Sequence, residues 1–248
     1  MDEVGRGALA GPVSVGAVAV DLRTRACPQG VADSKLLTPA ARERLRPALS
    51  RWGVARAVGH ASAEEIDALG IIPALRLAGR RALRGLAVEV DVVLLDGSHD
   101  WLSVPAQPAL FDEMPHQGPG GRLERAGPSV REARELDDAF APAVRMRIKA
   151  DRTCAAVAAA SVLAKCERDA MMVALAADHV AYGWHENKGY GAPEHLEALR
   201  RFGPTGLHRR SWRLPLQGLP VGADDPDEAA CSDVARTVGP PGWSMMDA

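Results

Sequence analysis

The sequence has few aromatic residues and no apolar run long enough to cross a bilayer. Phe, Trp and Tyr make up 4% of the 248 residues, so a core must be built from the Ala, Val and Leu within its 47% hydrophobic content. No basic start leads into the apolar segment of a secretory signal. We therefore expect a soluble cytoplasmic protein that has no membrane partner.

Cysteine is also scarce, and its spacing excludes two common roles. No two cysteines form a Cys-x-x-Cys pair, and the set lacks the pattern of a disulfide framework. We therefore expect reduced thiols rather than zinc ligands or disulfides at all four positions, which are Cys27, Cys154, Cys166 and Cys231.

The net charge of −2 hides an uneven distribution. Residues 221–248 contain six acidic residues and one arginine, a net of −5, so the rest of the chain carries about +3 (−2 minus −5). The Pro- and Gly-rich composition of residues 217–248 predicts a disordered acidic tail after a catalytic domain over residues 1–216. A mildly basic body permits nucleic-acid binding without indicating it.

The first informative motif is DEVGRG at residues 2–7. Carboxylates such as Asp2 and Glu3 are the ligands that hard divalent cations prefer, and the glycine-rich turn Gly5-Arg6-Gly7 offers backbone amides and a guanidinium to a phosphate. Together they suit chemistry on a phosphodiester. Taken alone, an acidic pair near a terminus is as often solvated surface.

Hydrophobic periodicity predicts alternating strands and helices, as in an α/β fold. Strands are expected over residues 8–20, 51–60, 88–97 and 144–148, and helices from residue 39, over 66–86, over 155–177 and from 193. Residues 98–144 are rich in Pro, Gly and Gln, which predicts an inserted, largely disordered loop.

Two further acidic residues adjoin predicted strands. Asp96 ends an apolar run at the edge where α/β sheets place their sites, although an Asp-Gly turn after a core strand is the alternative. Asp151 is expected to cap the long helix that follows it. Asp169 lies about 27 Å farther along such a helix, so we expect it to pair with Lys165, Arg168 or the substrate backbone instead.

Basic and aromatic residues occur in loops of the same chain. Lys35 precedes a helix and could meet a phosphate, and Tyr190 lies in the glycine-rich turn 187–191, where it could contact a sugar. The segment 208–212, HRRSW, adds arginines beside a tryptophan. Each feature alone equally fits a solvated basic face or a tyrosine packed on a turn.

Taken in order, these motifs resemble the ribonuclease HII family of bacteria, over residues 2 to about 215. The motifs are DEVGRG, DSK, LLDG, KAD, AAASVLAKCERD, NKGYG and HRRSW. The resemblance implies a ribonuclease H-like fold with a central mixed β-sheet flanked by helices, plus a small C-terminal helical part. It also implies an endoribonuclease that hydrolyses the RNA strand of RNA/DNA hybrids and nicks duplex DNA 5′ of embedded ribonucleotides.

The resemblance also assigns roles to individual residues. It makes Asp2, Glu3, Asp96 and Asp151 the catalytic acids, which suits a site for two Mg²⁺ or Mn²⁺ ions and products with 5′-phosphate and 3′-hydroxyl ends. It gives Tyr190 and the residues Gly5, Arg6 and Gly7 the recognition of the ribonucleotide 2′-hydroxyl. We expect a monomer.

One departure from the family leaves an alternative open. A strand normally precedes the acidic pair, whereas here only Met1 does, so most of that strand is expected to be missing. The alternative is therefore a catalytically impaired protein that binds RNA/DNA hybrids. A DNA nuclease on a related fold is a further candidate, which the ribose-recognition residues argue against.

Overall fold

The computed structural model describes residues 1–104, 128–138 and 142–216. In it, three antiparallel strands form the first part of the sheet. They are β1 (Asp2–Val4), β2 (Val13–Ala19) and β3 (Ala55–Ala61), in the order β1-β2-β3, and Asp2 lies opposite Gly16. The strand expected over residues 8–20 is present as β2, although it begins later than predicted.

A parallel pair of strands, β4 (Val92–Asp96) and β5 (Ala143–Arg147), continues the sheet through the backbone of Met1. The α-amino group of Met1 donates a 2.6 Å hydrogen bond to the carbonyl oxygen of Leu94, and the N–H of Asp96 donates one of 3.2 Å to the carbonyl of Met1. These bonds place β4 beside β1. The result is the mixed sheet that the sequence predicted.

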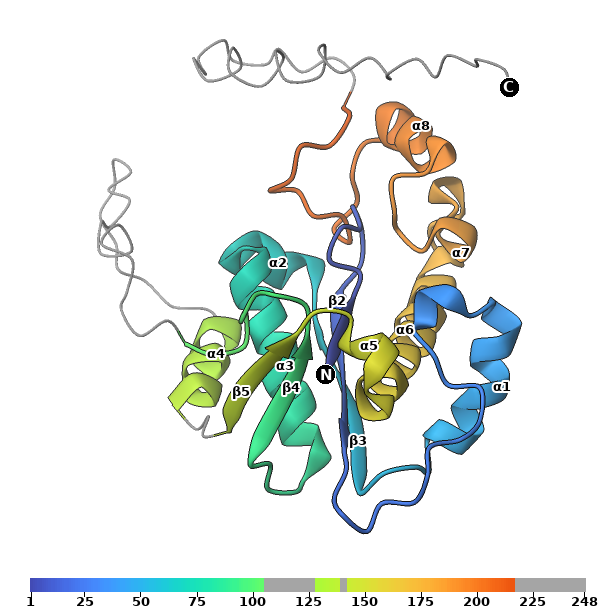
Figure 1. The fold of residues 1–248 in the computed structure, drawn as a ribbon. Coiled ribbons are helices and arrows are strands. Elements are labelled where there is room, and N and C mark those ends of the chain that lie inside the picture. Colours follow the sequence, from blue (N-terminus) through green and yellow to red (C-terminus); the bar gives the residue numbers. More distant parts are fainter. Residues whose placement is uncertain (105–127, 139–141, 217–248) are drawn as a thin grey trace, which may run out of the picture. The chain divides into compact units, whose positions relative to one another are not determined.

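Two long helices approach the sheet at glycines. A Cβ atom on Gly16 would lie 2.2 Å from the carbonyl oxygen of Ala160 in α6 (Ala155–Ala176), and one on Gly59 would lie 2.1 Å from that of Ala78 in α3 (Ile71–Leu86). No other residue type leaves room for such close contact. Figure 1 shows α3 and α6 on either side of the strands.

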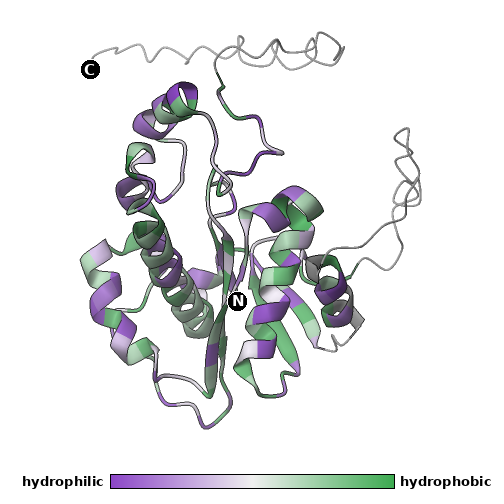
Figure 2. Cartoon of the chain, turned by 180° about the vertical axis from the view of Figure 1, so that it is seen from behind, coloured by the Kyte–Doolittle hydropathy of each residue, from purple (hydrophilic) through white to green (hydrophobic). Residues whose placement is uncertain are grey.

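Aliphatic and small side chains fill the space between sheet and helices, as the composition requires. The largest cluster joins strand residues such as Val15 and Leu95 to Leu75 of α3. A second cluster, built around Trp184 and Tyr182, forms the C-terminal helical part. In Figure 2 the strands are mainly hydrophobic, whereas the helices carry both colours, as expected of elements with one buried face.

Local capping explains where several helices begin. Thr38 accepts a hydrogen bond from the N–H of Ala41 at the start of α1 (Pro39–Leu49), and Ser62 and Glu65 form a capping box at α2 (Ala63–Leu69). The remaining elements are the short helices η1 (Ser34–Leu36), α5 (Ala150–Thr153), η2 (Val180–Tyr182) and α7 (Trp184–Asn187), and α8 (Pro193–Phe202).

Two predicted helix features are wrong at their boundaries. The helix expected over 66–86 is divided into α2 and α3 at Gly70, whose φ of +82° is a conformation that glycine adopts readily. Asp151 does not cap α6; it lies in the separate turn α5, and Cys154 is the N-cap residue of α6 without a side-chain bond.

The structureless loop expected over 98–144 is wrong at both of its ends. Trp101 and Leu102 are buried in the main core, and residues 128–138 form helix α4 (Pro128–Asp138), from which Glu132 accepts a 3.0 Å hydrogen bond from Arg81. The polar composition of the whole stretch concealed these short ordered pieces. Residues 105–127 and 139–141, like the predicted acidic tail, lie outside the described residues.

Two sequence expectations about bilayers and thiols can be compared with the described residues. No helix among them has both the length and the apolar character that crossing a bilayer requires. Cys27, Cys154 and Cys166 are free thiols, as predicted, and Cys231 lies outside the described residues.

Candidate active site

The predicted acidic residues come from three elements that meet beside the end of β4. The backbone of Met1 places Asp2 of β1 next to β4, whose last residue is Asp96. The N–H of Ala150 donates a 2.7 Å hydrogen bond to Oδ1 of Asp96, which brings α5 and its Asp151 to the same place. Residues separated by up to 149 positions are thereby neighbours.

Burial and repulsion between charges disfavour the ionised forms of Asp2, Glu3 and Asp151. Asp2 and Asp151 are 4% and 5% exposed. Burial raises the pKa of Asp2 and of Glu3, and in both cases the charge of Asp96 adds to the effect. Burial also raises the pKa of Asp151 to about 6, with further contributions from the charges of Asp96, Asp33 and Asp2.

Lys35 partly compensates this negative charge. Its ammonium group lowers the pKa of both Asp2 and Asp151, so it lies within electrostatic range of the cluster, while the side chain is exposed. The backbone N–H of Lys35 donates a 2.9 Å hydrogen bond to Oδ1 of Asp33, which fixes the start of η1.

One buried oxygen in the cluster lacks a partner. Oδ1 of Asp151 is inaccessible to solvent and accepts no hydrogen bond from any described residue. A carboxylate oxygen in this state is expected to bind a cation. Within the described ranges, however, no three His, Cys, Asp or Glu side chains are arranged as a complete metal site. The carboxylate oxygens fit a divalent ion by their chemistry.

The predicted ribose-binding residues form two adjacent turns. The turn of Gly5, Arg6 and Gly7 follows β1, and the N–H groups of Leu9 and Ala10 both donate to the carbonyl oxygen of Gly189, at 2.8 and 3.2 Å. These bonds connect the first turn to the one that carries Tyr190.

Two side chains of these turns face outward. The guanidinium of Arg6 lies 3.9 Å from the Glu3 carboxylate and is 47% exposed, so it borders the acidic cluster. Tyr190 is 36% exposed, and the guanidinium of Arg168 lies 5.4 Å from the centroid of its ring. The arginine supports the tyrosine and leaves part of the ring accessible.

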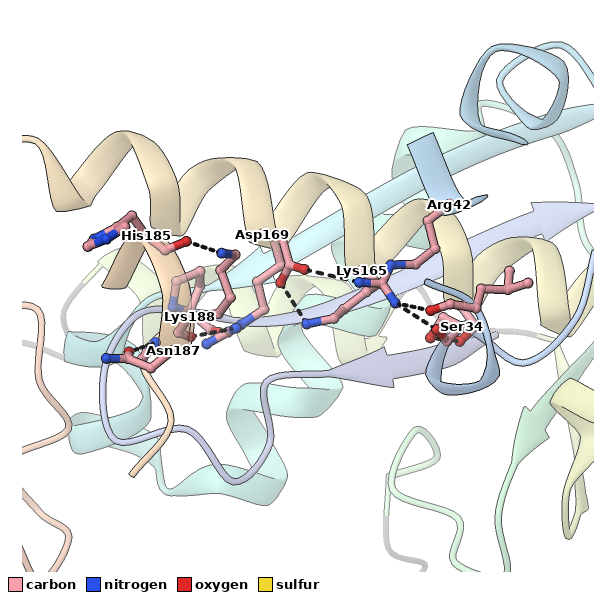
Figure 3. A network of polar contacts seen from close by, with 12 residues as sticks. Ser34, Arg42, Lys165, Asp169, His185, Asn187 and Lys188 are labelled. Atoms are coloured by element: carbon pink, nitrogen blue, oxygen red, sulfur yellow. Dashed lines mark hydrogen bonds and ion pairs between the residues drawn. The ribbon is translucent and has the colours of Figure 1, made fainter. Parts of the chain in front are cut away.

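Asp169 belongs to a separate network, as predicted from its position along the helix. Its carboxylate accepts a 2.7 Å hydrogen bond from Lys165 and lies 3.8 Å from Arg42, which also donates to the carbonyl of Ser34 (Figure 3). The pairing with Lys165 confirms one of the expected alternatives. The network links α6, α1 and η1 next to the turn 187–191.

Sequence reasoning missed two buried arginines. Arg209 was grouped with a basic, nucleic-acid-facing segment, but it is completely buried, as is Arg168. The correction has a clear physical basis: both guanidiniums donate to backbone carbonyls of the glycine-rich turns and cannot reach solvent. The sequence signal that could have indicated this burial is the pair of glycine-rich turns, whose backbone carbonyls lack regular hydrogen bonds and need donors.

An α/β sheet with acidic residues gathered beside a strand end is typical of metal-dependent hydrolases of phosphodiesters. The comparisons with known proteins agree. The family model for ribonuclease HII matches residues 1–110 and 125–214. The chain belongs to the ribonuclease HII family, and it is thus an endoribonuclease of the ribonuclease H type that degrades RNA in RNA/DNA hybrids.

Curated relatives support the same assignment. A ribonuclease HII from Streptomyces avermitilis is 44% identical over 220 residues, which cover 89% of this chain and 78% of that protein. A ribonuclease HII from Cereibacter sphaeroides is 39% identical over 213 residues, covering 86% of this chain and 82% of the relative. The resemblance predicted from the motifs is therefore confirmed.

Solved structures confirm the fold. The ribonuclease H2 of Pyrococcus horikoshii superposes with a TM-score of 0.57 at 24% identity, covering 86% of this chain and 92% of that one. The RNase HII of Archaeoglobus fulgidus, solved in a complex with PCNA, gives a TM-score of 0.54 at 24% identity and covers 85% and 91%. At this identity the likeness concerns the arrangement of the chain alone.

Proposed function

We propose that the chain nicks duplex DNA on the 5′ side of embedded ribonucleotides and cuts the RNA strand of hybrids by two-metal-ion hydrolysis. The products carry 5′-phosphate and 3′-hydroxyl ends. Asp2, Glu3, Asp96 and Asp151 hold the ions in this proposal. The observation that supports it most directly is the unpartnered, buried Oδ1 of Asp151 within a cluster of carboxyl groups that repel one another.

Bound Mg²⁺ or Mn²⁺ would supply an activated water and stabilisation of the leaving 3′-oxygen. The residues of the chain prepare the place for this chemistry. Ala150 fixes one oxygen of Asp96, and the burial of Asp2 and Asp151 removes competing water. Lys35 limits the excess negative charge, so that a polyanionic substrate can approach.

Recognition of the 2′-hydroxyl is assigned to the residues Gly5, Arg6 and Gly7 together with Tyr190. Backbone groups that hydrogen-bond the 2′-hydroxyl lose their partner when a deoxyribose binds. The unpaired groups cost binding free energy, so a deoxyribose binds less tightly. The two turns support this role because they are bonded to each other beside the acidic cluster. Discrimination and hydrolysis therefore occur on adjoining surfaces.

The test is a strand-nicking assay on a duplex that contains one ribonucleotide. We expect a nick with Mg²⁺ or Mn²⁺, no nick in chelator, and a loss of about 100-fold or more in kcat for Asp96→Asn. Asp178→Asn, which changes an exposed acid outside the cluster, is the matched control. Equal cutting of an all-deoxy duplex would contradict the assignment of ribose recognition.

A binding protein without hydrolytic activity is the second candidate, because β1 is short, with three residues. Metal-independent binding of the hybrid with no nick in either metal would favour it.

The proposed catalytic domain, residues 1–216, is tested in the same assay by ending the chain at Leu216, with unchanged nicking expected. We also propose that the protein is a monomer, which light scattering tests, and that it is cytoplasmic, which fractionation of cells tests.

A further inference from the structure

Two completely buried arginines lie beneath the turns proposed to read the ribose. Arg168 of α6 and Arg209 each have an exposed fraction of 0%. Among the described residues neither guanidinium is within ion-pair distance of a carboxylate, and burial lowers the pKa of Arg209 to about 9, with repulsion from Arg168 adding to the effect. A buried charge without a counter-ion is costly, so its contacts are expected to serve a purpose.

Arg209 binds the backbone carbonyls of the first turn. Its Nη1 donates a 2.8 Å hydrogen bond to the carbonyl of Arg6, and its Nη2 donates one of 2.6 Å to that of Gly5. Its Nε and Nη2 also donate to the carbonyl of Gly11, at 3.3 and 3.2 Å. The guanidinium thus uses its planar set of donors to hold three carbonyls of one loop.

Arg168 connects that loop to the turn that carries Tyr190. Its Nε donates a 2.8 Å hydrogen bond to the carbonyl of Pro12, and its Nη1 donates one of 3.0 Å to that of Lys188. The same guanidinium lies against the Tyr190 ring. A Cβ on Gly5 would lie 2.1 Å from Nε of Arg168, so the glycine and the arginine occupy a tightly shared space.

These contacts decide which way the amides of the first turn point. All described peptide bonds are trans, and a trans peptide directs its C=O and N–H groups to opposite sides. With the carbonyls of Gly5 and Arg6 turned toward Arg209, the N–H groups of Arg6 and Gly7 are turned away from it. Neither N–H has an acceptor within the described part of the chain, and a Cβ on Gly7 would meet nothing within 4 Å.

We infer that Arg168 and Arg209 are positioning residues for ribose discrimination: they hold the two turns as one unit and direct the N–H groups of Arg6 and Gly7 toward the substrate. The inference rests on the proposed ribose-reading role of these turns. Lysine has a similar length but lacks the planar donors that reach several carbonyls at once. Arginine-to-lysine substitution should therefore weaken discrimination between ribose and deoxyribose.

The test compares Arg168→Lys and Arg209→Lys with Arg201→Lys, an exposed arginine on α8 that serves as control. Dissociation constants are measured with Ca²⁺ for a duplex containing one ribonucleotide and for its all-deoxy counterpart, together with thermal unfolding of each variant. For both buried positions the preference for the ribonucleotide duplex should fall by about 10-fold or more, while affinity for the all-deoxy duplex changes by less than about 2-fold. The control should retain the preference.

Two other outcomes have distinct meanings. If both lysine variants lower the unfolding temperature but keep the full preference at a temperature where they are folded, the arginines are merely structural and the inference is wrong. If the unchanged chain shows no preference at all, the proposed ribose-reading role fails first. Should one lysine variant be unfolded, the other buried position is measured alone with the same expectation.

Discussion

The backbone N–H of Ala150 donates a 2.7 Å hydrogen bond to the carboxylate of Asp96, 54 residues earlier in the chain. This bond fixes the orientation of Asp96 and places the next residue, Asp151, in the same cluster. The site is thus built from the end of β4 and the one-turn helix α5, which are distant in sequence and joined by this hydrogen bond.

Asp151→Asn should stabilise the metal-free protein at neutral pH. The folded-state pKa of Asp151 is raised to about 6, so the folded chain binds the proton more tightly than the unfolded chain, and stability falls as pH rises from about 4 through 6. Asparagine removes this loss, by about 1–3 kcal/mol. Thermal unfolding in chelator at pH 4 and pH 7.5 measures it, with the difference between variant and parent expected only at the higher pH.

Divalent ions should reverse that order of stability. An ion bound by the carboxylates stabilises the folded state in proportion to its occupancy, and the asparagine variant binds it less well. In excess Mn²⁺ at pH 7.5 the parent should therefore gain more in unfolding temperature than Asp151→Asn. Equal gains would show that Asp151 does not hold the ion.

Lys35→Gln should move the pH dependence of nicking to higher pH. The ammonium group lowers the pKa of Asp2 and Asp151, so its loss leaves both carboxyl groups protonated to a higher pH and delays metal binding. The activity midpoint is compared with that of Arg51→Gln, an exposed residue after α1. A reduced dependence on salt with an unchanged midpoint would instead indicate a phosphate contact.

Tyr190→Ala should weaken binding of the ribonucleotide duplex by about 1–3 kcal/mol, the range measured for contacts between aromatic side chains and nucleotides. Tyr190→Phe separates ring from hydroxyl, because it keeps the partly exposed ring that Arg168 supports. The measurement is the KM for nicking. An alanine variant with parental KM would remove Tyr190 from the recognition surface.

Gly16→Ala should destabilise the fold by about 1–3 kcal/mol, the usual cost of overpacking a well-filled core. Its Cβ would lie 2.2 Å from the carbonyl oxygen of Ala160, a backbone atom of α6 that cannot rotate away. Gly206→Ala is the matched control, since a Cβ there meets nothing within 4 Å. Urea unfolding of both variants gives the comparison, and equal midpoints would mean that α6 can shift.

Much of the fold followed from local patterns. The periodic stretch from residue 39, the apolar run before Asp96 and the stretch over 155–177 each indicated an element that the structure contains. Boundaries were less accurate where one residue overrides periodicity, as Gly70 does between α2 and α3. The long insertion was misjudged because Trp101 and Leu102 gain their burial by packing with α3, a contact that local composition does not show.

The sequence by itself determined the chemical groups: the four acids, the glycine-rich turns, Tyr190 and the order in which they occur, which sufficed for the family. Only the tertiary structure decided that Asp151 has a buried, unpartnered oxygen and that Arg168 and Arg209 face backbone carbonyls rather than solvent. Burial and hydrogen-bond direction depend on contacts between residues up to 204 positions apart. Local propensity carries no information about such contacts, because the atoms that make them become neighbours only when the chain folds.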